Sequence, residues 1–184
     1  RDMGVIRTNP MILKRDVGFS AKYDNQSVWV FGDTMLATPN AEDRILLSNS
    51  RSSTYDFDAS DGIDGLTEQV DEVGAPRAFF PMTEEEKAYN SRNIGKVCEE
   101  DSCTAHWCIW PGTILVDEKK DWAYVFYRKI RVERGIYNFQ HIGHSIAVWK
   151  DFSKPVERPV FNFFKIYPTM FFAEGGGNGF GSAA

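Results

Sequence analysis

The strongest constraint on the fold is a β-hairpin close to the beginning of the chain. Residues 18–23 and 27–31 are rich in aromatic and β-branched side chains, and the stretch between them is Asp24-Asn25-Gln26. Aspartate and asparagine favour tight turns because they tolerate the left-handed backbone conformation and hydrogen-bond their own backbone. The pattern predicts two antiparallel strands that end at Gly32.

Similar strand patterns recur along the chain. Residues 112–116 and 122–127 predict a second hairpin around a polar turn, and residues 145–149 predict a further strand. Residues 180–184 begin another strand of the first kind. Hairpins that start near glycines and are separated by long loops are typical of a radial repeat of four-stranded sheets. We expect an all-β, propeller-type fold.

The number of predicted strands accounts for only two to three blades of such a propeller. Residues 1–184 are therefore expected to be a single propeller-type domain, truncated at the C-terminus. Closure by oligomerisation and an open sandwich are the alternatives, because a propeller must close to remove its exposed strand edges.

Two other segments depart from the strand pattern. Thr83 followed by three glutamates predicts a short surface helix over residues 83–89, with Thr83 as its cap. Residues 52–74 are rich in Asp, Ser and Gly and are expected to form a long loop.

Composition argues against two classes of partner. The net charge of -5 and the pI of about 5.3 give no electrostatic reason to expect binding to nucleic acid or to an anionic membrane surface. No apolar stretch approaches the roughly 20 residues needed to span a bilayer.

The chain begins without a signal segment, which fits a cytoplasmic protein or one whose signal has been removed. We expect an extracellular or cell-surface location.

The three cysteines lie close together, at Cys98, Cys103 and Cys108, with His106 among them. A zinc site is one interpretation, but structural zinc sites use four ligands at more regular spacings. One disulfide and one buried thiol is the preferred prediction.

The first hairpin also brings two carboxylates to one end of a blade. Asp16 precedes its first strand and Asp33 follows its second, and a hairpin returns to its origin. Glycoside hydrolysis requires such a pair, because one carboxylic acid protonates the leaving oxygen while the other acts as base or nucleophile. The alternative is structural: Asp33 caps Thr34 and Asp16 pairs with Arg15.

Several segments together resemble the family of domains of unknown function 4185, which includes the endo-D-arabinanases of glycoside hydrolase family 183. The resemblance covers most of the chain. The segments that carry it are RDVGFS at Arg15, VWVFGDTML at Val28, FFPMTEEEKAYN at Phe79, WPGTILV at Trp110, VFYRKI at Val125 and FFAEGGGNGFGSAA at Phe171.

The resemblance implies a five-bladed β-propeller whose central cavity hydrolyses an arabinan-like furanoside polysaccharide or oligosaccharide. The matching positions Asp16 and Asp33 would be the catalytic pair, and we favour Asp16 as base or nucleophile and Asp33 as acid. The resemblance implies no organic cofactor, and it leaves open whether a structural metal ion lies at the centre of the propeller.

Other residues are candidates for substrate binding. Trp110 offers an aromatic face to a sugar, or is a core residue. Glu174 is a third carboxylate that would tune the pKa of the pair, or is an exposed turn residue. Asn49 and Arg51 follow a strand and would hydrogen-bond the hydroxyl groups of a sugar; the alternative is that they cap a loop. His144 begins a strand at the same face, or is structural; His141 and His144 would need a third ligand to hold a metal.

Two further functions remain possible from the sequence. A non-catalytic carbohydrate-binding propeller would keep Trp110 and the polar loops and tolerate loss of either aspartate. A structural interaction module would not bind sugar, and the pKa values of its carboxylates would not be perturbed.

Overall fold

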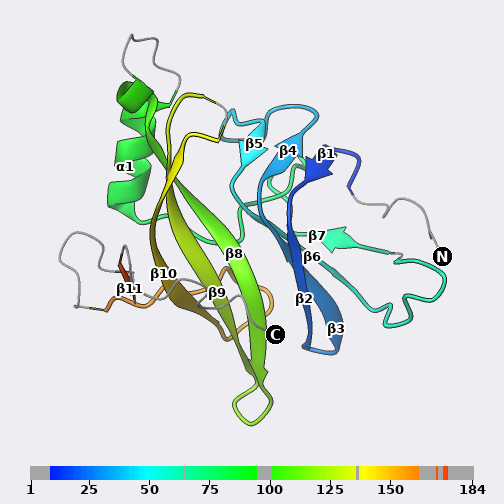
Figure 1. The fold of residues 1–184 in the computed structure, drawn as a ribbon. Helices are drawn as coiled ribbons and strands as arrows, with labels where there is room; N and C mark the ends of the chain where they lie inside the picture. Colours follow the sequence, from blue (N-terminus) through cyan, green and yellow to red (C-terminus); the bar gives the residue numbers. More distant parts are fainter. Residues whose placement is uncertain are drawn as a thin grey trace.

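A computed structural model of the chain describes residues 9–63, 65–94, 101–135, 137–161, 169 and 172–173. Within these residues the protein is mostly β, with three antiparallel sheets and the single α-helix α1 (Figure 1). The expected all-β class is therefore confirmed at this level. None of the helical residues described forms a segment long and apolar enough to cross a membrane.

The first sheet contains the predicted N-terminal hairpin. Its strands are β2 (Gly18–Tyr23), β3 (Gln26–Phe31), β6 (Ser50–Thr54) and β7 (Thr67–Glu68), in the order β2-β3-β6-β7. The hairpin turn is only two residues long, and both Asp24 and Asn25 have positive φ, at 50° and 54°. That conformation matches the twist of the strands, which is why these two residue types stand here.

The second sheet is built from the longest strands. It contains β8 (His106–Asp117), β9 (Trp122–Val132), β10 (Phe139–Trp149) and β11 (Phe172–Ala173), in the order β11-β10-β9-β8. The second hairpin and the following strand are confirmed, and each strand is longer than the sequence indicated. The register of β8 against β9 shifts once, between Pro111 and Ile114, next to a proline that cannot donate to the ladder.

The two four-stranded sheets pack against each other through one core. Buried side chains of β3, including Val28 and Val30, belong to the same cluster as Val125 of β9 and Trp149 of β10. Strands β2 and β8, the first of each sheet, lie side by side. Both adjacent blades of a propeller and the two layers of an open sandwich pack in this way. None of the sheets closes on itself within the described residues, so the five-bladed propeller stays a prediction, as does the extent of the domain.

A small third sheet lies at the end of the first hairpin. It contains β1 (Ile12–Arg15), β4 (Thr34–Leu36) and β5 (Leu46–Leu47), in the order β1-β4-β5. Leu36 and Leu47 form a separate buried cluster beneath it with Ala75. Since β1 leads into β2 and β3 leads into β4, this sheet fixes both junctions of the hairpin.

Helix α1 (Glu84–Asn93) begins where the sequence predicted and extends four residues further than expected. Thr83 accepts the backbone N–H of Glu86, and the Glu86 carboxylate accepts the backbone N–H of Thr83. This capping box satisfies two donors that helix geometry would leave free. A 3-10 turn, Asp101–Thr104, precedes β8.

The prediction of one long loop over residues 52–74 is wrong, because β6 and β7 occupy part of it. Every residue of β6 is buried although none is apolar. Hydroxyl groups make this possible: Ser50 bonds Thr34 at 2.7 Å and Ser52 donates to Glu68 at 2.8 Å. Buried polar groups that are hydrogen-bonded do not carry the full cost of desolvation.

Candidate functional site

Asp16 and Asp33 lie side by side at the end of the first hairpin. The backbone N–H of Asp16 donates to the carbonyl of Asp33 at 2.8 Å, and the N–H of Gly32 donates to the carbonyl of Asp16 at 2.8 Å. A Cβ atom at Gly32 would stand 3.2 Å from that carbonyl oxygen, so glycine permits this close approach. The hairpin thus brings the two residues together as its geometry predicts; their catalytic roles stay a prediction.

The backbone beside Asp16 is strained. Val17 has a φ of 48°, which is rare for a β-branched residue. The Asp16 carboxylate accepts the N–H of Val17 at 2.9 Å and so supports this conformation. Strained residues cluster at functional sites, because they persist only where the surrounding structure requires them.

Arg15 does not pair with Asp16, which removes one structural alternative. Its guanidinium donates to both oxygens of Glu68, at 2.6 and 3.1 Å, and lies 4.2 Å from the centre of the Phe31 ring. Both members of the ion pair are buried. Asp16 is exposed, and its carboxylate is not the partner of the neighbouring Arg15.

Asp33 has a different environment from Asp16. Its side chain is half-buried, and its Oδ1 accepts the indole N–H of Trp110 at 3.0 Å. Burial raises the pKa of the Asp33 carboxyl, and the charge of Asp16 raises it further. The hydrogen bond from Trp110 and the charge of His106 lower this pKa. The net shift is upward, which favours the protonated form. Asp33 does not cap Thr34, whose hydroxyl donates to the Gly32 carbonyl instead.

Trp110 is a half-buried residue of β8 and not a core tryptophan. Its ring meets Phe139 of β10 edge to face, with centroids 5.2 Å apart. Phe139 is 48% exposed, so the pair presents aromatic surface beside Asp33. Such a surface suits the C–H face of a sugar ring.

His106 is a neighbour of Asp33, although sequence reasoning considered it only as a zinc ligand beside the cysteines. It stands two and four residues before Cys108 and Trp110 on β8, so all three lie on one face of the strand. A ring N–H at Nδ1 donates to the Thr104 carbonyl at 3.2 Å. The sequence signal that would have found His106 is its even spacing from Trp110, since residues four apart on a strand lie on the same face.

Two predicted sugar-binding residues are buried structural groups instead. Asn49 is 1% exposed; its amide donates to the Ile109 carbonyl and accepts the N–H groups of Phe79 and Phe80. The Arg51 guanidinium lies 4.7 and 4.5 Å from the centres of the Trp149 and Phe152 rings, which stack on each other.

Burial lowers the pKa of Arg51 to about 10, against the opposing charge of Glu68. The side-chain groups of Asn49 and Arg51 are thus engaged within the protein and not at the carboxylate pair, so the structure does not support their assignment as hydroxyl-binding residues there.

His144 is also buried, at 3% exposure, and its ring lies 4.3 Å from that of His141. The strand register places it in one row with Arg128 and Trp110. His144 therefore lies on the same face of the sheet as Trp110, but it is buried. The prediction that it contacts a sugar directly is not supported. Glu174 lies outside the described residues.

The cysteine prediction is confirmed for the two described cysteines. Cys103 is disulfide-bonded and Cys108 is a buried free thiol. Burial raises the pKa of Cys108 to about 12, so the thiol is unreactive. Among the residues that the structure describes, no three His, Cys, Asp or Glu side chains gather in a way that would hold a metal ion.

Comparisons with known proteins do not identify the chain. No protein-family model matches it, and no curated protein matches it. Among solved structures, it is similar to a "putative hydrolase" from Bacteroides ovatus ATCC 8483, with a TM-score of 0.43 and 14% sequence identity. The alignment covers 80% of this chain and 37% of that one, so the chain spans little over a third of that protein's length.

Proposed function

We propose that the protein is a glycoside hydrolase that uses Asp16 and Asp33 to cleave an arabinan-like furanoside. The observation that carries the proposal is the contact of two carboxylate residues with unequal environments. Asp33 is half-buried with a raised pKa, whereas Asp16 is exposed. Pairs of titratable groups whose surroundings differ in this way are typical of acid and base partners. The resemblance to family 183 arabinanases supports the substrate class.

In the proposed reaction Asp33 is the acid. Its carboxyl gives a proton to the glycosidic oxygen as the bond from that oxygen to the anomeric carbon breaks. Asp16 either takes a proton from the attacking water or attacks the anomeric carbon itself. Trp110 orients the Asp33 carboxyl through its N–H, and with Phe139 it offers a face to the sugar.

The first test is release of reducing sugar from arabinan and arabinogalactan by the full-length protein that contains residues 1–184. Asp16→Asn and Asp33→Asn are each expected to abolish most hydrolysis. Asp24→Asn is the matched control, because Asp24 is exposed in the turn at the other end of the same hairpin and asparagine also adopts its positive φ. Loss of activity in Asp24→Asn to the same degree would contradict the proposal.

A carbohydrate-binding function without catalysis is the second candidate, favoured by the exposed aromatic surface of Trp110 and Phe139. In that case Asp33 serves only to hold the indole. Folded protein that binds arabinan but hydrolyses no furanoside, with binding lost in Trp110→Ala, would favour this function over hydrolysis.

The pH dependence of hydrolysis gives a further prediction. An acid must be protonated, so activity falls as the pH rises through the pKa of Asp33. Because the charge of Asp16 raises that pKa, Asp16→Asn should move the alkaline limb of any residual activity to lower pH. Trp110→Phe removes a bond that lowers the pKa, so it should move the limb to higher pH. Profiles of kcat/KM that shift in the opposite directions would contradict the assignment of Asp33 as acid.

A further inference from the structure

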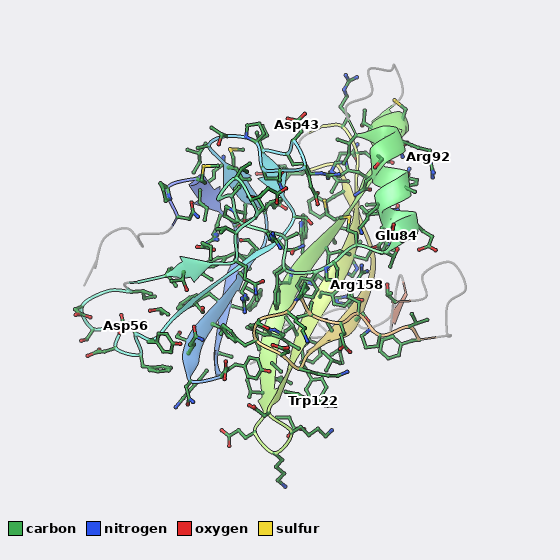
Figure 2. The ribbon with its side chains drawn as sticks, turned by 180° about the vertical axis from the view of Figure 1, so that it is seen from behind. Asp43, Asp56, Glu84, Arg92, Trp122 and Arg158 are labelled. Carbon is green, nitrogen blue, oxygen red and sulfur yellow. The ribbon has the colours of Figure 1, made fainter. Side chains whose placement is uncertain are left out.

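A cavity of about 450 Å³ lies apart from the carboxylate pair. Its walls are the segment 40–49, the segment 71–82 and Lys87 of α1. Figure 2 labels Asp43, in the loop that forms one wall, and Glu84 and Arg92, which mark the helix that carries Lys87. The volume falls within the roughly 300–1,000 Å³ of small-molecule sites. Asp16 and Asp33 do not line it.

Hydrogen bonds fix the two loops at this cavity. The Asp71 carboxylate accepts the N–H of Ala41 from one loop at 2.8 Å, and those of Val73 and Ala75 from its own loop at 3.1 and 2.9 Å. Asp71 therefore joins the two walls; it also lines the cavity, as do the carboxylates of Glu42 and Glu72. A site held in this way before a ligand arrives loses little conformational freedom on binding.

The guanidinium groups that line the cavity are weakly paired. Arg44 lies 3.7 Å from Glu42, and Arg77 lies 4.0 Å from Glu72. The glutamate side chains are 77% and 74% exposed, so solvent screens them and these ion pairs contribute little. The donors of both arginines therefore remain available to a charged acceptor.

The interior of the cavity is partly apolar. Leu47 and Phe80 line it and are otherwise buried, and Met82 lies beside them. A lining that combines apolar side chains with a small number of charged donors favours a compact organic ligand that carries an anionic group. Arginine is well suited to such groups, because its fork binds a carboxylate or phosphate through two parallel bonds.

We propose that this cavity binds a small ligand with one anionic group, a carboxylate or a phosphate, and that Arg44 and Arg77 recognise that group. Lys87 on the facing helix adds a third positive group, paired at 2.8 Å with the exposed Glu84. The site is independent of hydrolysis, since the carboxylate pair lies outside it.

The test is titration of the full-length protein with galacturonate and, separately, with inorganic phosphate, followed by calorimetry. Galactose is the neutral counterpart. At least one acidic probe should bind, galactose should not, and which acid binds more tightly distinguishes a carboxylate from a phosphate site. Arg44→Gln and Arg77→Gln should each weaken binding about tenfold or more, and added salt should weaken it too.

Arg131→Gln is the matched control, because Arg131 lies on β9, pairs with Glu133 just after that strand, and does not line the cavity. It should bind the acidic probes like the wild type, and so should Asp33→Asn even if that variant is inactive. Equal binding of galactose, no binding of either acid, or acid binding that survives in folded Arg44→Gln and Arg77→Gln would overturn the proposal.

Discussion

Asp33→Asn is expected to lower hydrolysis of arabinan by about 10²–10⁴-fold while leaving the first step on 4-nitrophenyl arabinofuranoside, the single-turnover release of nitrophenolate, close to the wild-type rate. The arabinan leaving group is a poor one and needs a proton from Asp33. Nitrophenolate leaves without one, so loss of the acid costs little on this substrate. Asp16→Asn should be defective on both substrates, because base or nucleophile is required for either.

The asparagine variant is a sharp test because it preserves the local contacts. Its side-chain oxygen still accepts the Trp110 N–H that Asp33 accepts at 3.0 Å. Unchanged tryptophan fluorescence would verify that Trp110 has kept its environment. If Asp33→Asn lost both activities while Asp16→Asn kept the nitrophenyl activity, the two roles would be reversed; equal retention by both variants would exclude the pair as catalysts.

The parts of this site that the sequence predicted are those that depend on local structure. The Asp24-Asn25 turn fixes the hairpin register, and that register returns the chain from Asp16 to Asp33. The helix start at Thr83 follows from the same kind of local rule, because the capping box lies within four residues.

The parts that were missed depend on contacts between distant segments. Strand β6 has no apolar residue, and its burial is possible only because Thr34 and Glu68 bond its hydroxyl groups. Asn49 looks like a loop residue until its amide is seen to bond Ile109, 60 residues away. The cavity likewise combines loops that no spacing rule connects.

Glu86→Gln is expected to destabilise the protein by about 3–5 kcal/mol, as is usual when one member of a buried ion pair is removed. Glu86 accepts Lys129 at 2.6 Å and Arg158 at 2.6 and 3.0 Å, and all three side chains are at most 6% exposed. Figure 2 shows Arg158 below the first turn of α1, which Glu84 marks. Without the carboxylate, two buried cations face each other.

Glu84→Gln is the matched control on the same helix turn. Glu84 pairs with Lys87 at 2.8 Å, but both side chains are largely exposed, so its loss should cost about 1 kcal/mol or less. Urea unfolding of the two variants measures the difference. Adding Lys129→Met to Glu86→Gln should recover part of the lost stability, since it removes one unpaired buried charge.

The effect of Glu86→Gln should also depend on pH. Burial alone would raise the pKa of Glu86, but the bonds and charges of Arg158 and Lys129 outweigh burial and lower it to about 2, from an ordinary value of 4.5. A carboxyl with a depressed pKa stabilises the fold above its unfolded value and loses that contribution as the pH falls towards its folded value. The shift corresponds to about 3 kcal/mol.

The difference in unfolding free energy between wild type and Glu86→Gln should therefore be full above about pH 5 and shrink steadily towards pH 2. Protonated Glu86 and glutamine are both neutral, so the two proteins become alike at the acid end. A difference that stayed constant over this range would mean that the carboxylate charge does not hold α1 to the second sheet. Shape and hydrogen bonding alone would then account for the contact.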